Sequence, residues 1–204
     1  MKNIASIDFS INSTCMCVFS GDGYSWHHFS RDGMKYFDIG SKFFKTQTFS
    51  KRESKSDYCS TERMKVVDAQ TLCSSIVKTL EKNRVDAIAF EGHSFNSKGN
   101  SLLELVSYQF LLRNMIIRDL NFSPNALFFY SPVTVKAFAG GARYKKTDML
   151  NAFLECDDEL LQKNPVYIKL KTQSDQLIKK DNVIKPIDDL VDSYWIVKKL
   201  QQDV

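Results

Sequence analysis

The 204-residue chain has few cysteines, few prolines and no long hydrophobic run. Its five cysteines are odd in number and form no Cys-x-x-Cys pair, so neither a disulfide framework nor a zinc site is indicated. No stretch of about 18 apolar residues occurs, which argues against a membrane-spanning helix. Asp8 interrupts the N-terminal segment where a signal peptide would need its apolar stretch. We therefore expect a protein of a reducing compartment, the cytoplasm, with no membrane partner.

The residues that are present fit an ordinary globular protein. Apolar residues make up 43% and charged residues 25% of the chain, which excludes disorder throughout. The length predicts one domain, residues 1–204, large enough to bury a real core. The net charge of +4 is weak, but its sign favours a polyanionic partner.

The hydrophobic periodicity predicts a mixed α/β fold. Alternation predicts three strands joined by turns, at residues 3–9, 14–19 and 24–29. Apolar residues at three- and four-residue steps predict helices at about 60–83, 101–120, 133–139, 146–155 and 186–201, and short apolar runs predict strands at 85–91 and 126–130. An antiparallel three-strand meander followed by alternating helix and strand indicates a mixed five-stranded sheet flanked by helices.

Carboxylates occur in three places where secondary structure alone does not require them. They are Asp8 in the first strand, Glu91 at the end of a later strand, and Asp188, Asp189 and Asp192 in the last helix. Each alone could be solvated or could complement a helix dipole. Together they would repel one another unless a cation lay among them, so their convergence would indicate Mg²⁺ or Mn²⁺. Asp189 and Asp192, three residues apart, can face one ion, and Asp188 remains an alternative to Asp189.

Four segments resemble, in order, the signature segments of the RuvC-type Holliday-junction resolvases, especially the bacteriophage-encoded ones: IASIDFSINSTCMCVF, DAIAFEGHSF, SPVTVKAFAGGARYKKTDML and KPIDDLVDSYWIVKKL. The resemblance covers about residues 3–30 and 61–200. It implies a ribonuclease H-like fold. The first segment alone also resembles the phosphate-binding hairpin of actin-like ATPases. An ATPase fragment is therefore one alternative, and a catalytically inactive junction-binding protein is another.

The resemblance also implies an active site. It makes Asp8, Glu91, Asp189 and Asp192 the ligands of two Mg²⁺ ions, for which Mn²⁺ would substitute, and it places Lys146 near the scissile phosphate. The implied activity is paired, metal-dependent nicking of four-way junctions and other branched DNA, which leaves 5′-phosphate and 3′-hydroxyl ends. Such an enzyme serves DNA recombination and repair. If the chain is phage-encoded, it would act in the host cytoplasm.

The resemblance implies four further DNA contacts. Lys136 and Lys145 match basic positions near the cut strand, and Lys145 could exchange roles with Lys146. Phe95 and Lys98 lie in the loop after the second acidic strand, where an exposed aromatic ring is also a good platform for stacking on a base.

Two stretches depart from the family pattern, at about residues 31–60 and 157–185. Residues 31–63 hold eight lysines and arginines against five acidic residues, and residues 163–185 hold six lysines against two aspartates. The first is predicted to be a loop or an irregular insertion. Each is either an arm that contacts DNA phosphates, which we favour, or a disordered linker.

The substrate implies a homodimer. A four-way junction has two-fold symmetry, so two symmetric nicks require two active sites related by a dyad. The helix at 101–120 is rich in Leu, Tyr, Phe and Met. It is the candidate interface, and the alternative is that it only covers the sheet.

Overall fold

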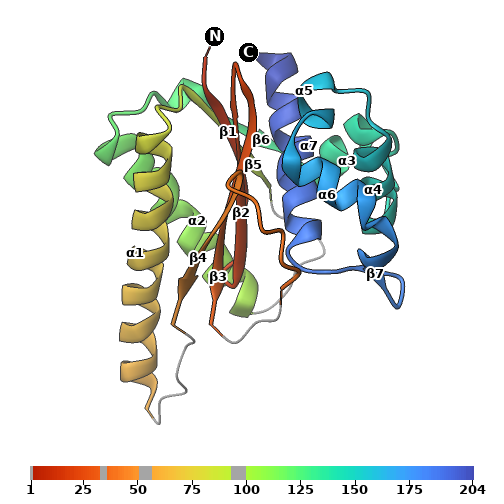
Figure 1. The fold of residues 1–204 in the computed structure, drawn as a ribbon. Coiled ribbons are helices and arrows are strands. Elements are labelled where there is room, and N and C mark those ends of the chain that lie inside the picture. The colour runs from red at the N-terminus through yellow and green to blue at the C-terminus, as the bar shows by residue number, and fades with distance from the viewer. Residues whose placement is uncertain (1, 33–35, 51–56, 93–99) are drawn as a thin grey trace.

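The computed structural model describes residues 2–32, 36–50, 57–92 and 100–204, which build a mixed sheet with helices on both faces (Figure 1). The sheet has six strands in the order β4-β3-β2-β1-β5-β6. The predicted meander is confirmed as β1 (Ile4–Asp8), β2 (Ser13–Ser20) and β3 (Gly23–Arg31), which pair antiparallel. On the other side of β1, β5 (Ala87–Glu91) and β6 (Leu127–Tyr130) continue the sheet in parallel.

The sixth strand, β4 (Phe44–Phe49), corrects the expected number of five. It lies parallel to β3 at the edge of the sheet, within the region that was expected to be a loop. Its four middle residues are exposed, and their sequence, KTQT, has no alternating apolar pattern. An edge strand with this exposure needs few apolar side chains, so hydrophobic periodicity could not identify it.

The helices lie on both faces of the sheet (Figure 1). The layer on one face is α1 (Tyr58–Lys82) and α2 (Asn100–Asp119). On the other face α7 (Ile187–Asp203) lies against the sheet, and α3 (Pro132–Ala139) and α4 (Lys146–Glu155) contact it. A short 3₁₀ helix, η1 (Pro124–Ala126), precedes β6. No helix within the described ranges is long and apolar enough to cross a membrane.

Residues 157–185 are folded, so the alternative that they form a disordered linker is wrong. They contain α5 (Glu159–Gln162), α6 (Pro165–Thr172), η2 (Ser174–Gln176), and a hairpin of β7 (Ile178–Lys179) and β8 (Asn182–Val183). Five of their apolar side chains are buried in the core on the α7 side of the sheet: Leu161, Val166, Leu170, Leu177 and Val183. The elements are short, and lysines lie between the buried positions, which hides the pattern in the sequence.

Candidate active site

Two acidic side chains lie together at the ends of the two central strands. The parallel register of β1 and β5 pairs Ile7 with Phe90, so Asp8 and Glu91 follow side by side. Ser6 Oγ donates a hydrogen bond to a main-chain carbonyl of α7. Because side chains alternate along a strand, Asp8, two residues further on, faces α7 as well.

The first two turns of α7 bring three more carboxylates to this end of the sheet. The side chains of Asp188 and Asp189 are each only 4% exposed, and that of Asp192 is 20% exposed. Burial raises the pKa of Asp8 well above its usual range. Three neighbouring charges raise it further, those of Asp189, Asp192 and Glu91. The four predicted ligands therefore act on one another electrostatically.

The pKa values of the other three carboxylates in this group are raised as well. Burial, followed by the charge of Asp192, raises the pKa of Glu91 to about 7. Burial raises the pKa of Asp192 to about 6, although Lys146 opposes the rise. The pKa of Asp189 is raised by burial and then by Asp188. The metal-free protein thus holds carboxylates whose charged forms are disfavoured, an arrangement common at functional sites.

Two lysines lie against these carboxylates. Lys146, the first residue of α4, pairs with Asp188 through its Nζ, which is 3.9 Å from Asp192 Oδ2. Lys185, just before α7, pairs with Asp189 and lies 3.1 Å from Asp188 Oδ2. Burial alone would lower the pKa of each lysine, but the carboxylates outweigh it and raise both. Lys185 was not predicted, although its i,i+3 and i,i+4 spacing to two aspartates was a readable signal.

The donor chemistry of this cluster fits a hard divalent cation. Every acidic donor is a carboxylate oxygen, the ligand type that Mg²⁺ and Mn²⁺ prefer. Asp188 Oδ1 is buried without a hydrogen-bond partner among the described residues. Within those residues, however, no three His, Cys, Asp or Glu side chains stand close enough to hold an ion as they are. In this arrangement Lys146 and Lys185 balance part of the negative charge.

Of the remaining predicted residues, two lie at or beside the site and two lie outside the described residues. Lys136, on α3, is partly buried, and its charge acts on Glu91, whose pKa it lowers. Lys145 is exposed next to Lys146 at the N-terminus of α4. Phe95 and Lys98 lie outside the described residues.

Two buried polar residues at the site were not predicted from the sequence. Ser13 Oγ donates a hydrogen bond of 2.5 Å to Asp189 Oδ2, and it lies 3.0 Å from His28 Nε2. Burial, followed by the charge of Lys185, lowers the pKa of His28 to about 4. The sequence placed both residues in the meander, but nothing in their spacing connected them with an aspartate about 160 residues or more away.

Comparisons with known proteins identify the fold. No family model and no curated protein matches the chain. The structure of Thermus thermophilus RuvC matches it with a TM-score of 0.53 and 12% identity, over 98% of this chain and 95% of that one. T. thermophilus RuvC in complex with a Holliday junction substrate gives 0.50 and 12%, over 98% and 97%. The yeast mitochondrial Holliday junction resolvase Ydc2 gives 0.50 and 14%, over 96% and 75%. The expected ribonuclease H-like fold of these resolvases is confirmed.

The raised pKa values predict how the stability of the metal-free protein depends on pH. Glu91 and Asp192 bind protons more tightly when folded than when unfolded, so the contribution of these two groups to stability should rise as pH falls from 8 toward 5. The lowered pKa values of His27 and His28 act in the opposite direction below about pH 6.5, so the effect is read from the difference between wild type and variant. Glu91→Gln should stabilise the protein at pH 8 by about 2 kcal/mol, and the difference should shrink as pH falls. Urea unfolding in EDTA at several pH values measures both effects. Glu81→Gln, at an exposed position on α1, is the control. A stability difference between wild type and Glu91→Gln that is the same at pH 8 and pH 5 would contradict the cluster.

Proposed function

We propose that the protein is a metal-dependent, structure-selective endonuclease that resolves Holliday junctions and other branched DNA. The observation that carries the proposal is the convergence of Asp8, Glu91, Asp189 and Asp192, from two adjacent strands and one covering helix, beside Lys146. The fold supports it, because similar solved structures over nearly the whole chain are those of resolvases. One of them is a complex with a Holliday junction substrate.

In this proposal the four carboxylates would hold two Mg²⁺ ions, with Mn²⁺ as a substitute. Bound there, the cations would lower the pKa of an attacking water and stabilise charge on the leaving 3′ oxygen, giving 5′-phosphate and 3′-hydroxyl ends. Asp8 and Glu91 would be fixed ligands, since strand pairing sets their backbone positions. Asp189 and Asp192 would complete the set from α7.

The lysines would balance the negative charge of the DNA phosphates. The Nζ of Lys146 lies at the edge of the carboxylate cluster, and its side chain is 54% exposed, so it can reach a phosphate that enters from solvent. Its positive charge would stabilise the negative charge that develops on the phosphoryl oxygens without any proton transfer. Lys136 and Lys145 would hold the neighbouring backbone of the cut strand.

The enzyme is a better interpretation than an inactive junction-binding protein. Glu91 and Asp192 are carboxylates with raised pKa values, and keeping them charged at neutral pH costs folding free energy. A protein that only binds DNA would gain nothing from this cost, since buried negative charge also repels phosphate. ATP binding measured by calorimetry would test the ATPase alternative.

The exposed side of α2 supports the proposed homodimer. Leu112 and Ile116 of this helix are buried against the sheet side, whereas Leu103 and Phe110 are 67% and 69% exposed. Val106 lies between them in the same stripe and is 40% exposed. The helix therefore covers the sheet with one face and presents an apolar stripe on the other, so it can cover the sheet and also form the dimer interface.

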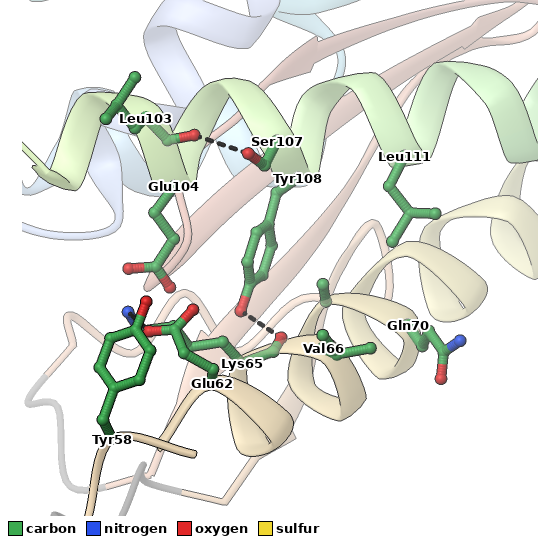
Figure 2. A pocket seen from close by; sticks show the side chains of 11 residues that line it. Tyr58, Glu62, Lys65, Val66, Gln70, Leu103, Glu104, Ser107, Tyr108 and Leu111 are labelled. Atoms are coloured by element: carbon green, nitrogen blue, oxygen red, sulfur yellow. Dashed lines mark hydrogen bonds and ion pairs between the residues drawn. The ribbon is translucent and has the colours of Figure 1, made fainter. Parts of the chain in front are cut away.

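A groove between α1 and α2 runs beside this stripe. It has a volume of about 620 Å³. Figure 2 shows Tyr108 and Leu111 of α2 pointing toward α1, where Tyr58 and Val66 also line the groove, whereas the side chain of Leu103 points away from α1. A second copy of the chain would bind at this groove, because a four-way junction with two-fold symmetry needs two active sites. A dimer formed here would leave the α7 face of each copy, with its carboxylates, uncovered for DNA (Figure 1).

The first prediction from this function concerns the ligands. Asp8→Asn, Glu91→Gln, Asp189→Asn and Asp192→Asn should each abolish Mg²⁺-dependent nicking of a labelled four-way junction, because each removes ligand charge with almost no change in volume. Binding of the junction in EDTA should persist in all four variants.

The matched control is Asp188→Asn, which lies in the same helix but pairs with the two lysines and should be milder. If Asp188→Asn abolishes nicking while Asp189→Asn does not, the ligand in this turn is Asp188. Wild-type nicking rates in Asp8→Asn or Glu91→Gln would overturn the proposed site.

The second prediction concerns the dimer. Phe110→Glu or Leu103→Lys should convert a dimer at micromolar concentration into a monomer, as seen by light scattering. On a supercoiled cruciform plasmid the wild type should yield mainly linear DNA, and these variants should accumulate nicked circles, because a monomer cuts one strand per binding event. Val204→Glu, which changes an exposed apolar residue at the end of the chain, is the control. A wild type that is monomeric both free and on the junction would instead favour a nickase of flaps or Y-branches.

The third prediction concerns the basic hairpin. Lys179 and Lys180 are exposed at β7, on the face of the sheet opposite α1 (Figure 1). If they contact phosphates, changing both to Gln should lower the slope of log affinity against log salt by about 1 to 2, at roughly 0.9 per phosphate. Lys78→Gln with Lys82→Gln, on α1, should leave the slope unchanged. An unchanged slope in the hairpin variant would show that the hairpin does not contact DNA.

A further inference from the structure

Asp189 is held by a different partner on each of its two carboxylate oxygens. Oδ1 accepts from Lys185 Nζ, and Oδ2 accepts from Ser13 Oγ. Ser13 in turn lies 3.0 Å from His28 Nε2. We propose that Ser13 and His28 form a buried hydrogen-bonded relay that positions Asp189 to bind the metal. This inference rests on the proposed function and adds two positioning residues to it.

Strand alternation places the relay on the correct face of the sheet. On β2, Cys15 and Cys17 pack in the core beneath α7, so Ser13, two residues before Cys15, faces α7 too. The antiparallel register pairs Cys15 with His28, which makes His28 a diagonal neighbour of Ser13. Ser13, His28 and Asp189 are 2%, 1% and 3% exposed. Water therefore has little access to these hydrogen bonds.

The protons can be assigned from the donors available. A serine hydroxyl carries one proton, and the Ser13 hydroxyl donates it to the Asp189 carboxylate. His28 Nε2 must then be the protonated nitrogen and donate to Ser13 Oγ, which leaves Nδ1 as an acceptor. Nδ1 has no partner among the described residues, as this tautomer allows. His28 is neutral, since burial and Lys185 disfavour the imidazolium.

A segment between β3 and β4 supports both partners of Asp189. Tyr36 packs edge-to-face on the His28 ring at 4.8 Å, and its hydroxyl also interacts with Ser13. The next residue, Phe37, donates its main-chain N–H to the Lys185 carbonyl at 2.9 Å. This part of the first departure from the family pattern thus fixes the relay on one oxygen of Asp189 and the lysine on the other.

Ser13 and Lys185 together fix the orientation of the Asp189 carboxylate. A carboxylate can accept about four hydrogen bonds or metal bonds. Ser13 and Lys185 occupy one direction on each oxygen and leave the others free. Without Ser13 the side chain could rotate about its last bond, and the lone pairs offered to the ion would no longer be fixed. Groups that orient metal ligands in this way typically contribute 10–100-fold to metal affinity or activity.

The test measures metal binding directly, by calorimetric titration of the DNA-free protein with Mn²⁺. Ser13→Ala and His28→Phe should each weaken Mn²⁺ binding by about 10–100-fold. His28→Gln restores an N–H donor and should recover most of that loss. The wild type and these three variants, assayed on four-way junctions, should show a matching shift in the Mg²⁺ concentration needed for half-maximal nicking, with little change in the rate at saturating metal.

Ser6→Ala is the matched control, because it removes another buried strand hydroxyl that bonds α7 through a main-chain carbonyl. It should lower the melting temperature without changing Mn²⁺ affinity. The relay is wrong if Ser13→Ala binds Mn²⁺ as tightly as the wild type, or if Ser6→Ala weakens binding equally. A wild type that binds Mn²⁺ but cuts no branched DNA would overturn the proposed function, and the relay would then be judged by the Mn²⁺ affinities of the variants alone. A wild type that binds no Mn²⁺ would overturn both.

Discussion

The parallel pairing of β1 with β5 brings Asp8 and Glu91 together, because these two residues directly follow the paired residues Ile7 and Phe90. Once this pair is fixed, any helix that covers the sheet must either shield two partly buried carboxylates or add to their charge. α7 does the second, with Asp189 and Asp192. The resulting repulsion is the main constraint on this end of the molecule. Together with burial, which is the larger cause, it raises the pKa values of the carboxylates, and the lysine that precedes α7, Lys185, balances part of their charge.

The middle and C-terminal part of α7 supplies the contacts that hold the helix in place against this repulsion. Tyr24 of β3 and Tyr194 of α7 both donate to the carboxylate of Asp158, at 2.6 and 3.2 Å. Lys198 Nζ lies 2.8 Å from the same carboxylate. Trp195 Nε1 donates to a main-chain carbonyl of α4. These contacts fix the rotation of the helix about its axis. A turn of one residue, about 100°, would replace one aspartate with another at the site.

The parts of the fold that the sequence could predict are those with a clear period. The meander, the two parallel strands and the long helices were identified to within a few residues, because each buries one face or both. The elements of β4 and of residues 157–185 were not assigned from the sequence, since they are short or polar. The choice between Asp188 and Asp189 could not be made from spacing. In the structure Asp188 pairs with both lysines, whereas Asp189 is among the charges that act on Asp8.

The charges of the site also argue for an order of events in the proposed reaction. Five carboxylates and two lysines carry a formal charge of −3 when all are ionised. A phosphodiester, itself −1, would be repelled by such a site. Two divalent cations would bring the formal charge to +1, so a phosphate entering afterwards would complete neutrality. The lysines alone cannot neutralise the site, because their two charges are already included in the formal charge of −3. Metal binding should therefore precede, and strengthen, the approach of the scissile phosphate to the carboxylates.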